Sequence, residues 1–283
     1  MEVFDKQLDL SGYFKRRLSK GQTLGLVPTM GALHKGHLSI VRKALVTDQY
    51  VVVSIFVNPT QFDNPNDLKN YPRVLNADLE NLTSIDPERI VVYAPTVEDV
   101  YGANPISENI HLGGLDLQME GKFRKGHFQG VATVVKKLFE IVKPQHAYFG
   151  EKDFQQLQIV RHLVKSFQLP VQIIGCEIYR EANGLAMSSR NRLLSEETKH
   201  AAGCIFQSLK QAKDTFPTKT FDEIKQQVVA DFENNTRFQL EYFEIAETET
   251  LAIHTHKNKS KKYRGCIAIF AGSVRLIDNI PLN

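Results

Sequence analysis

Up to about residue 180, short apolar runs alternate with stretches of helical spacing, and this alternation restricts the possible folds more than any other feature. The apolar runs contain many β-branched residues and are apolar nearly throughout, as strands covered on both faces are. The helical stretches between them fit crossover connections. The expected strands are Leu24–Val27, Val51–Val57, Arg89–Tyr93, His146–Phe149 and Val171–Ile178. We therefore predict an α/β fold built on a parallel sheet.

Beyond Asn183-Gly184 the order changes to helices first and strands after. This change predicts a smaller C-terminal α+β domain, so we expect one domain over residues 1–180 and a second over residues 181–283. The elements expected in the second domain are helices from Ser195 to about Phe216 and from Phe221 to Asn234, and strands Phe238–Ala246 and Gly265–Leu276.

The composition is that of an ordinary globular protein, with 42% hydrophobic and 24% charged residues in a chain of 283. No apolar run approaches the ~20 residues that cross a bilayer, and the start does not resemble a signal peptide. Cys176, Cys204 and Cys266 form no CxxC pair. We therefore expect a cytoplasmic protein with three packing thiols, no disulfide framework, no protein-held metal and no membrane partner.

The net charge of +3 is too small to indicate a nucleic-acid partner. The densest basic run, His254–Arg264, is not accompanied by aromatic residues on which bases could stack. We interpret it as a solvated loop and expect no binding of nucleic acid.

A decapeptide from Pro28 to His37, Pro-Thr-Met-Gly-Ala-Leu-His-Lys-Gly-His, follows the first expected strand. It predicts a strand that breaks at Pro28, a glycine turn, and a helix that begins near Gly36. Two imidazoles three residues apart at a helix start can act on one anion, because the free N–H groups and the helix dipole act there too. The spacing thus favours binding of a nucleotide phosphate. The alternative is that His34 or His37 only caps the helix.

A polar loop from Leu185 to Arg192 offers the hydroxyls of Ser188 and Ser189 and two guanidiniums. Arginine forks match phosphate oxygens, and hydroxyls and loop amides bind around them. Taken alone, such a sequence is also typical of linkers.

Two further polar motifs follow expected strands, where the ligand crevice of a parallel sheet lies. In Phe149–Gln156 a lysine can reach a phosphate and Asp153 can accept from ribose hydroxyls, although Asp153 could also only cap a helix. In Val57–Phe62, Asn58 and Gln61 offer amides and Phe62 an apolar wall, although Asn-Pro is also a turn signal.

The glycine-rich, basic segment Glu120–Gly130 is a candidate for a loop that closes over an anionic substrate, with Lys122–His127 as its moving part. It could equally be a mobile surface connection.

Two of these motifs resemble known nucleotide-binding sequences. His34-Lys35-Gly36-His37 resembles the HIGH motif of nucleotidyltransferases, and Met187-Ser188-Ser189-Arg190 resembles the KMSKS-type loop that clamps triphosphate. Several long blocks in order extend the likeness from Val27 to Asn279: PTMGALHKGH, VSIFVNPTQF, GHFQGVATVVKKLF, FGEKDFQQL and MSSRN. Together they resemble the pantoate–β-alanine ligase family.

The resemblance implies a Rossmann-like sheet with a HIGH-type nucleotide site and a C-terminal lid domain that carries the Ser-Ser-Arg loop. It implies ATP-dependent condensation of (R)-pantoate with β-alanine through pantoyl adenylate, with Mg²⁺ as cofactor and a homodimer as the assembly. Another HIGH-type nucleotidyltransferase and a nucleotide-binding regulator without chemistry are the alternatives.

The resemblance also implies roles for single residues. His34, His37, Lys152 and Arg190 would be catalytic. Gln61 and Gln156 would hold pantoate, beside Asn58 and Phe62, and Gln61 would also serve the β-alanine position. The sequence has Ala77-Asp78 where the family often has two acids, so no direct metal role is expected for Asp78. The ATP site would be formed by Met30, Gly31, His34, Gly36, His37, Gly150, Lys152, Asp153, Tyr179 (through its backbone), Met187, Ser188, Ser189 and Arg190.

Overall fold

The computed structural model describes residues 1–63 and 65–283, which form two compact units. Unit 1 contains Met1–Asp116, Gly121–Glu151 and Gln156–Glu177. Unit 2 contains Ile178–Asn283 together with two short segments from earlier in the chain, Leu117–Glu120 and Lys152–Gln155.

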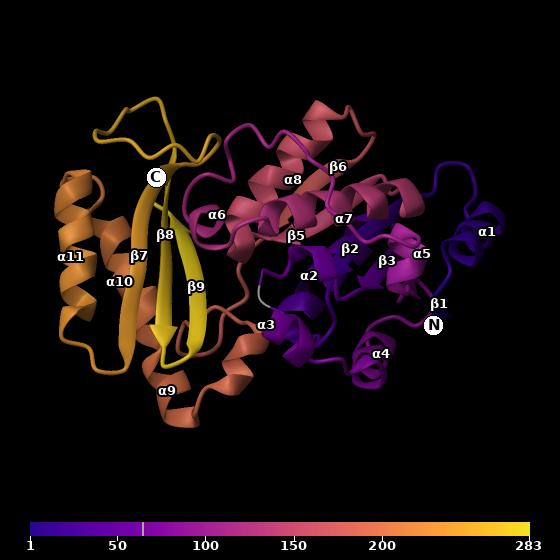
Figure 1. The fold of residues 1–283 in the computed structure, drawn as a ribbon, viewed down its shortest axis with the longest axis horizontal. Helices are drawn as coiled ribbons and strands as arrows, with labels where there is room; N and C mark the ends of the chain where they lie inside the picture. Colours follow the sequence, from indigo (N-terminus) through magenta and orange to yellow (C-terminus); the bar gives the residue numbers. More distant parts are fainter. Residues whose placement is uncertain (64) are drawn as a thin grey trace. The chain divides into compact units, whose positions relative to one another are not determined.

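Unit 1 is built on a parallel sheet, as the alternating pattern predicts, and the sheet has one strand more than the five expected (Figure 1). The strand order is β1-β4-β3-β2-β5-β6, so the chain adds strands on one side of β2 and later on the other. The order reverses between β2 and β5, and open α/β sheets bind ligands beyond the strand ends at such a point. The strands are β1 (Glu2–Phe4), β2 (Leu24–Thr29), β3 (Tyr50–Ile55), β4 (Ile90–Tyr93), β5 (His146–Gly150) and β6 (Gln172–Cys176).

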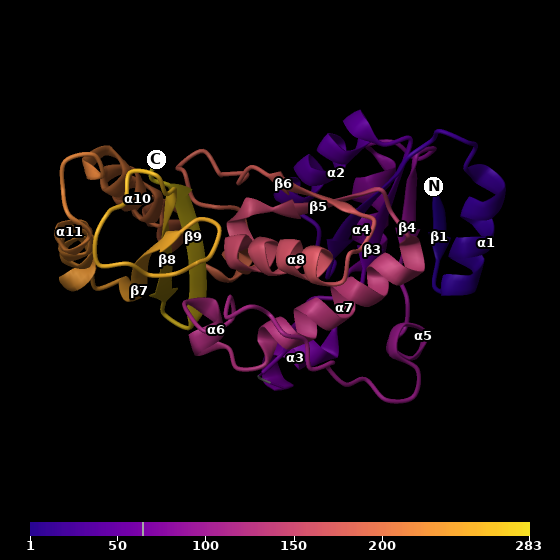
Figure 2. The ribbon, with the colours of Figure 1, turned by 90° about the horizontal axis from the view of Figure 1, so that it is seen from above.

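Helices cover both faces of this sheet, with α2 and α4 on one face and α7 and α8 on the other (Figure 2). Val41 and Leu45 of α2 pack with Val51 and Val53 of β3 in a buried apolar cluster. The helices and 3₁₀ turns of this part of the chain are α1 (Gln7–Arg17), α2 (Lys35–Thr47), η1 (Pro59–Gln61), α3 (Pro65–Asn70), α4 (Leu75–Thr83), α5 (Val97–Tyr101), α6 (Glu120–Phe123), α7 (His127–Val142), η2 (Glu151–Asp153) and α8 (Phe154–Ser166).

The predicted break of the first strand at Pro28 is wrong, because β2 continues through Pro28 to Thr29. Leu24 O accepts from Gln145 N on the β5 side, and Thr29 O accepts from Phe56 N on the β3 side. Since neighbouring residues of a strand face opposite sides, Pro28 faces β5, where the pairing ends at Leu26. The missing N–H of Pro28 therefore removes no ladder hydrogen bond.

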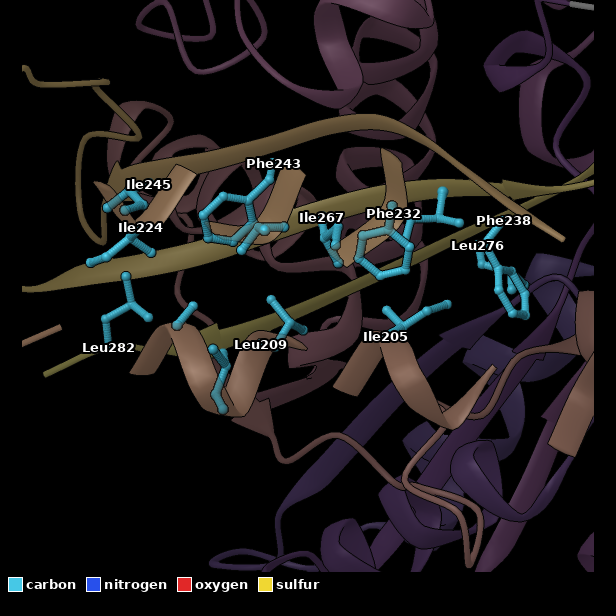
Figure 3. Packing of buried hydrophobic residues seen from close by; sticks show 14 of the residues in the cluster. Ile205, Leu209, Ile224, Phe232, Phe238, Phe243, Ile245, Ile267, Leu276 and Leu282 are labelled. Carbon is cyan, nitrogen blue, oxygen red and sulfur yellow. The ribbon is translucent and has the colours of Figure 1, made fainter. Parts of the chain in front are cut away.

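Unit 2 contains a three-stranded antiparallel sheet, β7-β8-β9, with two helices packed on it (Figure 1). Figure 3 shows its core, in which Ile205 and Leu209 of α10 and Ile224 of α11 face Phe243 and Ile267 of the sheet. The elements of this part are η3 (Ser189–Leu193), α9 (Glu196–Ala201), α10 (Gly203–Thr215), α11 (Phe221–Glu233), β7 (Phe238–Glu247), β8 (Tyr263–Ala271) and β9 (Val274–Pro281).

Two elements predicted for this region are wrong. The single helix from Ser195 is two helices, α9 and α10, separated at Ala202. The single strand Gly265–Leu276 is a hairpin of β8 and β9, turned at Gly272, whose φ of +59° suits glycine. Apolar residues continue on both sides of that turn, so periodicity alone does not mark it.

The three cysteines are unpaired, as expected. Burial raises the pKa of the Cys176 thiol to about 11 and that of Cys266 to about 12. Both thiols therefore stay protonated and unreactive near neutral pH. Among the described residues no helix is long and apolar enough to span a membrane.

Candidate active site

The loop that follows β2 is held in a defined left-handed turn. Gly31 and Ala32 have φ of +80° and +51°. Asp78 of α4, which is 1% exposed, accepts from Ala32 N at Oδ2 (2.9 Å) and from Leu33 N at Oδ1 (2.6 Å). A carboxylate that accepts two backbone N–H groups offsets the strain of a non-glycine residue at positive φ. Asp78 thus fixes the path of the chain into α2.

His34 and His37 meet at the start of α2, as the spacing predicts. Their rings stack with centroids 4.0 Å apart. Gly36 N donates to Nδ1 of His34 (3.2 Å), and His34 N donates to Nδ1 of His37 (3.3 Å). Because Nδ1 accepts in both rings, the proton of each neutral imidazole lies on Nε2. His34 therefore caps the helix and still carries an N–H donor, so the two interpretations of this motif are compatible.

The amide turn, Asn58–Gln61, lies next to this loop. Gln61 Nε2 contacts Met30 Sδ at 3.0 Å, and Asn58 Nδ2 donates to Gln61 Oε1 at 3.1 Å. Tyr101 Oη donates in turn to Asn58 Oδ1 at 2.7 Å. Asn58 also caps the 3₁₀ turn, as the turn interpretation predicts. The structure therefore joins the expected nucleotide loop and the expected substrate amides through Met30.

The start of α7 supports the amide turn from behind. Arg124 Nη1 donates to His127 Nε2 (3.1 Å), so His127 Nδ1–H donates to Gln61 O (2.8 Å). A Cβ on Gly130 would lie 2.2 Å from Thr60 O. Only glycine allows this close approach of α7 to η1.

Half of the closing loop expected at Lys122–His127 is helical. Lys122 and Phe123 belong to α6, and His127 is buried as the first residue of α7. Only residues 124–126 lie outside a helix. Gly121 and Gly130 provide close packing, whereas Gly126 has a φ of +77° and open space around it, so closure of this segment stays a prediction.

A second group of expected site residues comes together in unit 2. Lys152, Ser188 and Arg190 line one pocket, together with Arg275 and Asp278 of β9. The pocket places three cationic side chains, the hydroxyl of Ser188 and the carboxylate of Asp278 around one space, and cationic groups and hydroxyls of this kind suit phosphate oxygens. Ser188 Oγ also accepts from Arg190 N at 3.3 Å and so starts η3.

The Ser-Ser-Arg loop is anchored by a short hairpin. Met187 N donates to Tyr179 O at 2.9 Å. The backbone of Tyr179, an expected ATP contact, therefore lies next to Met187, another expected contact. Asn191 Nδ2 donates to Glu181 Oε1 (3.0 Å) and Ala186 O (3.1 Å). These bonds fix the loop that carries Ser188 to Arg190.

The remaining predicted residues are placed individually. Gly36 is in the first turn of α2, and a Cβ on Gly150, at the end of β5, would lie 3.4 Å from Ile40 of α2. Phe62 packs edge-on against Tyr71, and Gln156 lies in the first turn of α8. Asp153 and Ser189 are in unit 2, at the end of η2 and the start of η3.

Sequence reasoning missed the supporting residues Asp78, Tyr101 and the buried face of His127. Asp78 left one signal, an acid four residues before buried Leu82 on the same helix face. The contact of Tyr101 with Asn58 gave no signal in the sequence, because the two residues are 43 positions apart in the chain.

Comparison with known proteins decides the family. The sequence matches the profile of the family described as Pantoate-beta-alanine ligase over residues 2–281. The chain belongs to the pantoate–β-alanine ligase family. The pantothenate synthetase of Flavobacterium psychrophilum is 53% identical over 282 residues, covering 100% of both chains.

Solved structures of pantoate–β-alanine ligases share the fold. The pantothenate synthetase of Thermus thermophilus superimposes with a TM-score of 0.90 at 36% identity, covering 100% of this chain and 99% of that one. The enzyme of Francisella tularensis, determined in complex with Beta-gamma ATP and β-alanine, gives 0.76 at 34% identity, covering 100% and 98%. The family predicted from the sequence blocks is confirmed, and with it a nucleotide-binding ligase of pantothenate biosynthesis.

Proposed function

We propose that this chain condenses (R)-pantoate with β-alanine to pantothenate at the expense of ATP, through pantoyl adenylate. The observation that carries the proposal is the family match over residues 2–281. The polar groups that follow β2 and β3 supply the chemistry that this reaction needs.

In the first step a carboxylate oxygen of pantoate attacks the α-phosphorus of ATP, and the bond to the β-phosphate breaks to release pyrophosphate. No side-chain nucleophile takes part. The Nε2–H groups of His34 and His37 and the start of α2 would stabilise the charge that develops on the phosphate oxygens. Lys152, Ser188 and Arg190 would bind the β- and γ-phosphates.

In the second step the amine of β-alanine attacks the acyl carbon of the adenylate, loses a proton, and AMP leaves. Gln61 and Gln156 would orient the pantoyl group, with Asn58 holding Gln61 through its amide. Catalysis here is mainly positioning, because the mixed anhydride is already activated.

Mg²⁺ would enter with ATP. Among residues 1–63 and 65–283, no cluster of three His, Cys, Asp or Glu side chains could hold a metal. Both carboxylate oxygens of Asp78, which is buried at the nucleotide loop, accept hydrogen bonds from backbone N–H groups. These residues therefore suit a Mg²⁺ ion that is held by phosphate oxygens and water. Such an ion would offset the negative charge of the triphosphate.

Further expectations accompany this function. A homodimer, a cytoplasmic location and a lid role for residues 181–283 are part of the proposal.

Exchange of labelled pyrophosphate into ATP tests the proposal. With pantoate present and β-alanine absent, exchange is expected, because adenylate formation is reversible. Exchange without pantoate would favour another nucleotidyl acceptor. Absence of exchange, with ATP still bound, would favour a nucleotide-binding regulator.

A further inference from the structure

We propose that Asp278 and Asn279, at the carboxyl end of β9, are positioning residues for the phosphate pocket of unit 2. They hold the main chain at Lys152 and the hairpin of the Ser-Ser-Arg loop to one strand. The inference rests on the proposed function, because it assigns these residues to ATP use.

Asn279 holds the Lys152 segment. Its Nδ2 donates to the carbonyl oxygen of Lys152 at 2.9 Å. Its Oδ1 accepts from Nη1 of Arg264, whose guanidinium stacks 3.9 Å from the ring centre of Phe154. Because the bond goes to the backbone of Lys152, it fixes the start of the side chain without occupying the ammonium group.

Asp278 holds the hairpin that carries the Ser-Ser-Arg loop. It accepts from Arg180 Nη1 at 2.6 Å and from Nη2 at 2.9 Å. Arg180 Nη1 also donates to Gly184 O, and its guanidinium lies 3.7 Å from the ring centre of Phe206. Arg180 pairs with Ala186, whose carbonyl oxygen accepts from Asn191 in the turn after Ser188.

The two contacts meet in one dipeptide. Asn279 N donates to Asp278 Oδ1 at 2.7 Å, so the carboxylate of Asp278 is fixed to the main chain of Asn279. Asp278 lines the same pocket as Lys152, Ser188 and Arg190. Burial raises the pKa of its carboxyl, and the Arg180 fork opposes that rise. The paired guanidinium also screens the carboxylate from an incoming phosphate.

The decisive variant is Asn279→Ala, with Asn283→Ala as its matched control. Asn283 makes the same kind of contacts, accepting from Tyr263 N and donating to the carbonyl oxygen of Lys261, away from the residues that line the pocket. We expect Asn279→Ala to lower kcat/KM for ATP about 10- to 100-fold in the exchange assay and to raise KM for ATP. KM for pantoate should stay within about twofold of wild type, and Asn283→Ala should behave as wild type.

A second variant and a second assay separate positioning from folding. Arg180→Lys keeps the charge but not the fork, and it should also raise KM for ATP while the thermal midpoint stays well above the assay temperature. Condensation of supplied pantoyl adenylate with β-alanine should remain near wild type in both variants. A purely structural role would lower kcat for every substrate and leave KM for ATP unchanged, which would overturn the inference.

The outcomes also separate this inference from the proposed function. Wild-type protein without pantoate-dependent exchange would contradict the proposed function itself. Wild-type protein with exchange, together with unchanged KM for ATP in Asn279→Ala and Arg180→Lys, would contradict only the positioning role.

Discussion

At the scale of single residues, the proposed chemistry depends on donors whose direction the backbone sets. His34 and His37 accept main-chain N–H groups at Nδ1, which leaves the proton of each neutral ring on Nε2. Gln61 is held by Asn58 and by the backbone contact of its carbonyl with His127. Groups oriented in advance need no reorganisation as charge develops, which is the main source of transition-state stabilisation in such sites.

We predict that His37→Ala lowers turnover by roughly 10²–10³-fold, the effect of losing one transition-state donor, and that Lys152→Ala does the same. Steady-state release of AMP measures this. His256→Ala, on an exposed loop, is the control and should retain wild-type turnover. Near-normal turnover of either site variant would remove that residue from the mechanism.

Gln61→Ala is predicted to weaken pantoate binding and to leave ATP binding intact, because the amide turn would hold the acid rather than the nucleotide. Titration of the variant with each ligand by calorimetry decides this. Gln239→Ala, an exposed residue of β7, provides the comparison. Equal loss of affinity for both ligands would show that Gln61 acts on the nucleotide loop through Met30 instead.

At the scale of elements, local pattern was informative where one face of an element is apolar. Strands β2 to β6 and helix α11 appear within a few residues of their predicted ranges, and α2 begins within one residue of its predicted start, whereas the short edge strand β1 was not predicted. The errors at Pro28 and Ala202 share a cause, because each depends on a partner distant in sequence, whereas the turn at Gly272 is local and was missed because apolar residues continue on both sides of it. Pro28 is tolerated in β2 because the pairing of β2 with β5 has already ended at Leu26. At the break after Ala202 the chain packs closely on Asn183, since a Cβ on Gly203 would lie 2.6 Å from Asn183 O.

Gly130→Ala tests the packing of α7 on the amide turn. The added Cβ would lie 2.2 Å from Thr60 O and 2.7 Å from Gln61 Cα, so one element must move. We expect a loss of about 1–3 kcal/mol in the free energy of unfolding, measured with urea, and a higher KM for pantoate.

Gly12→Ala in α1 is the matched control for that substitution. Its Cβ would meet only Arg16 Nη1 at 3.6 Å, so the helix should gain about 0.5–1 kcal/mol. A gain of the same size in Gly130→Ala would contradict the close approach of α7 to η1.

The start of α11 predicts a pH effect. The Thr220 N–H and hydroxyl donate to Glu223 and lower the pKa of its carboxyl below the ordinary 4.5. A lowered folded-state pKa contributes stability that is present above the unfolded pKa and is lost as pH falls through the folded one. Glu223→Gln should therefore lose less stability than wild type on acidification below about pH 4.5. Thermal midpoints measured from pH 7 to pH 3 check this, and parallel curves would refute it.

At the scale of the whole molecule, the sequence predicted an α/β region followed by an α+β region. It did not predict that two short segments of the first region belong to unit 2. Leu117–Glu120 and Lys152–Gln155 group with unit 2. Arg275 explains the first, since it pairs with Glu120 at 2.7 Å and with Glu241 at 2.6 Å. Glu120 and Arg275 are 155 residues apart, and no local pattern encodes such a contact.

The candidate site likewise has parts that the sequence predicted and parts that it did not. Residue chemistry alone identified the imidazole pair, the amide turn and the Ser-Ser-Arg loop, and left ligand and capping roles open for each. The resemblance supplied the family, which the comparisons confirm. The contacts of Asp78 with Ala32, of Tyr101 with Asn58 and of Asn279 with Lys152 were beyond either argument, because they join residues between 43 and 127 positions apart in the chain.

The central claim is that pantoate is activated by adenylation, and isotope transfer tests it most directly. Pantoate labelled with ¹⁸O in its carboxylate would be condensed with β-alanine and ATP, and AMP and pantothenate would be analysed by mass spectrometry. The mechanism predicts one labelled oxygen in AMP and one in pantothenate. Label in inorganic phosphate together with ADP, or unlabelled AMP, would contradict it.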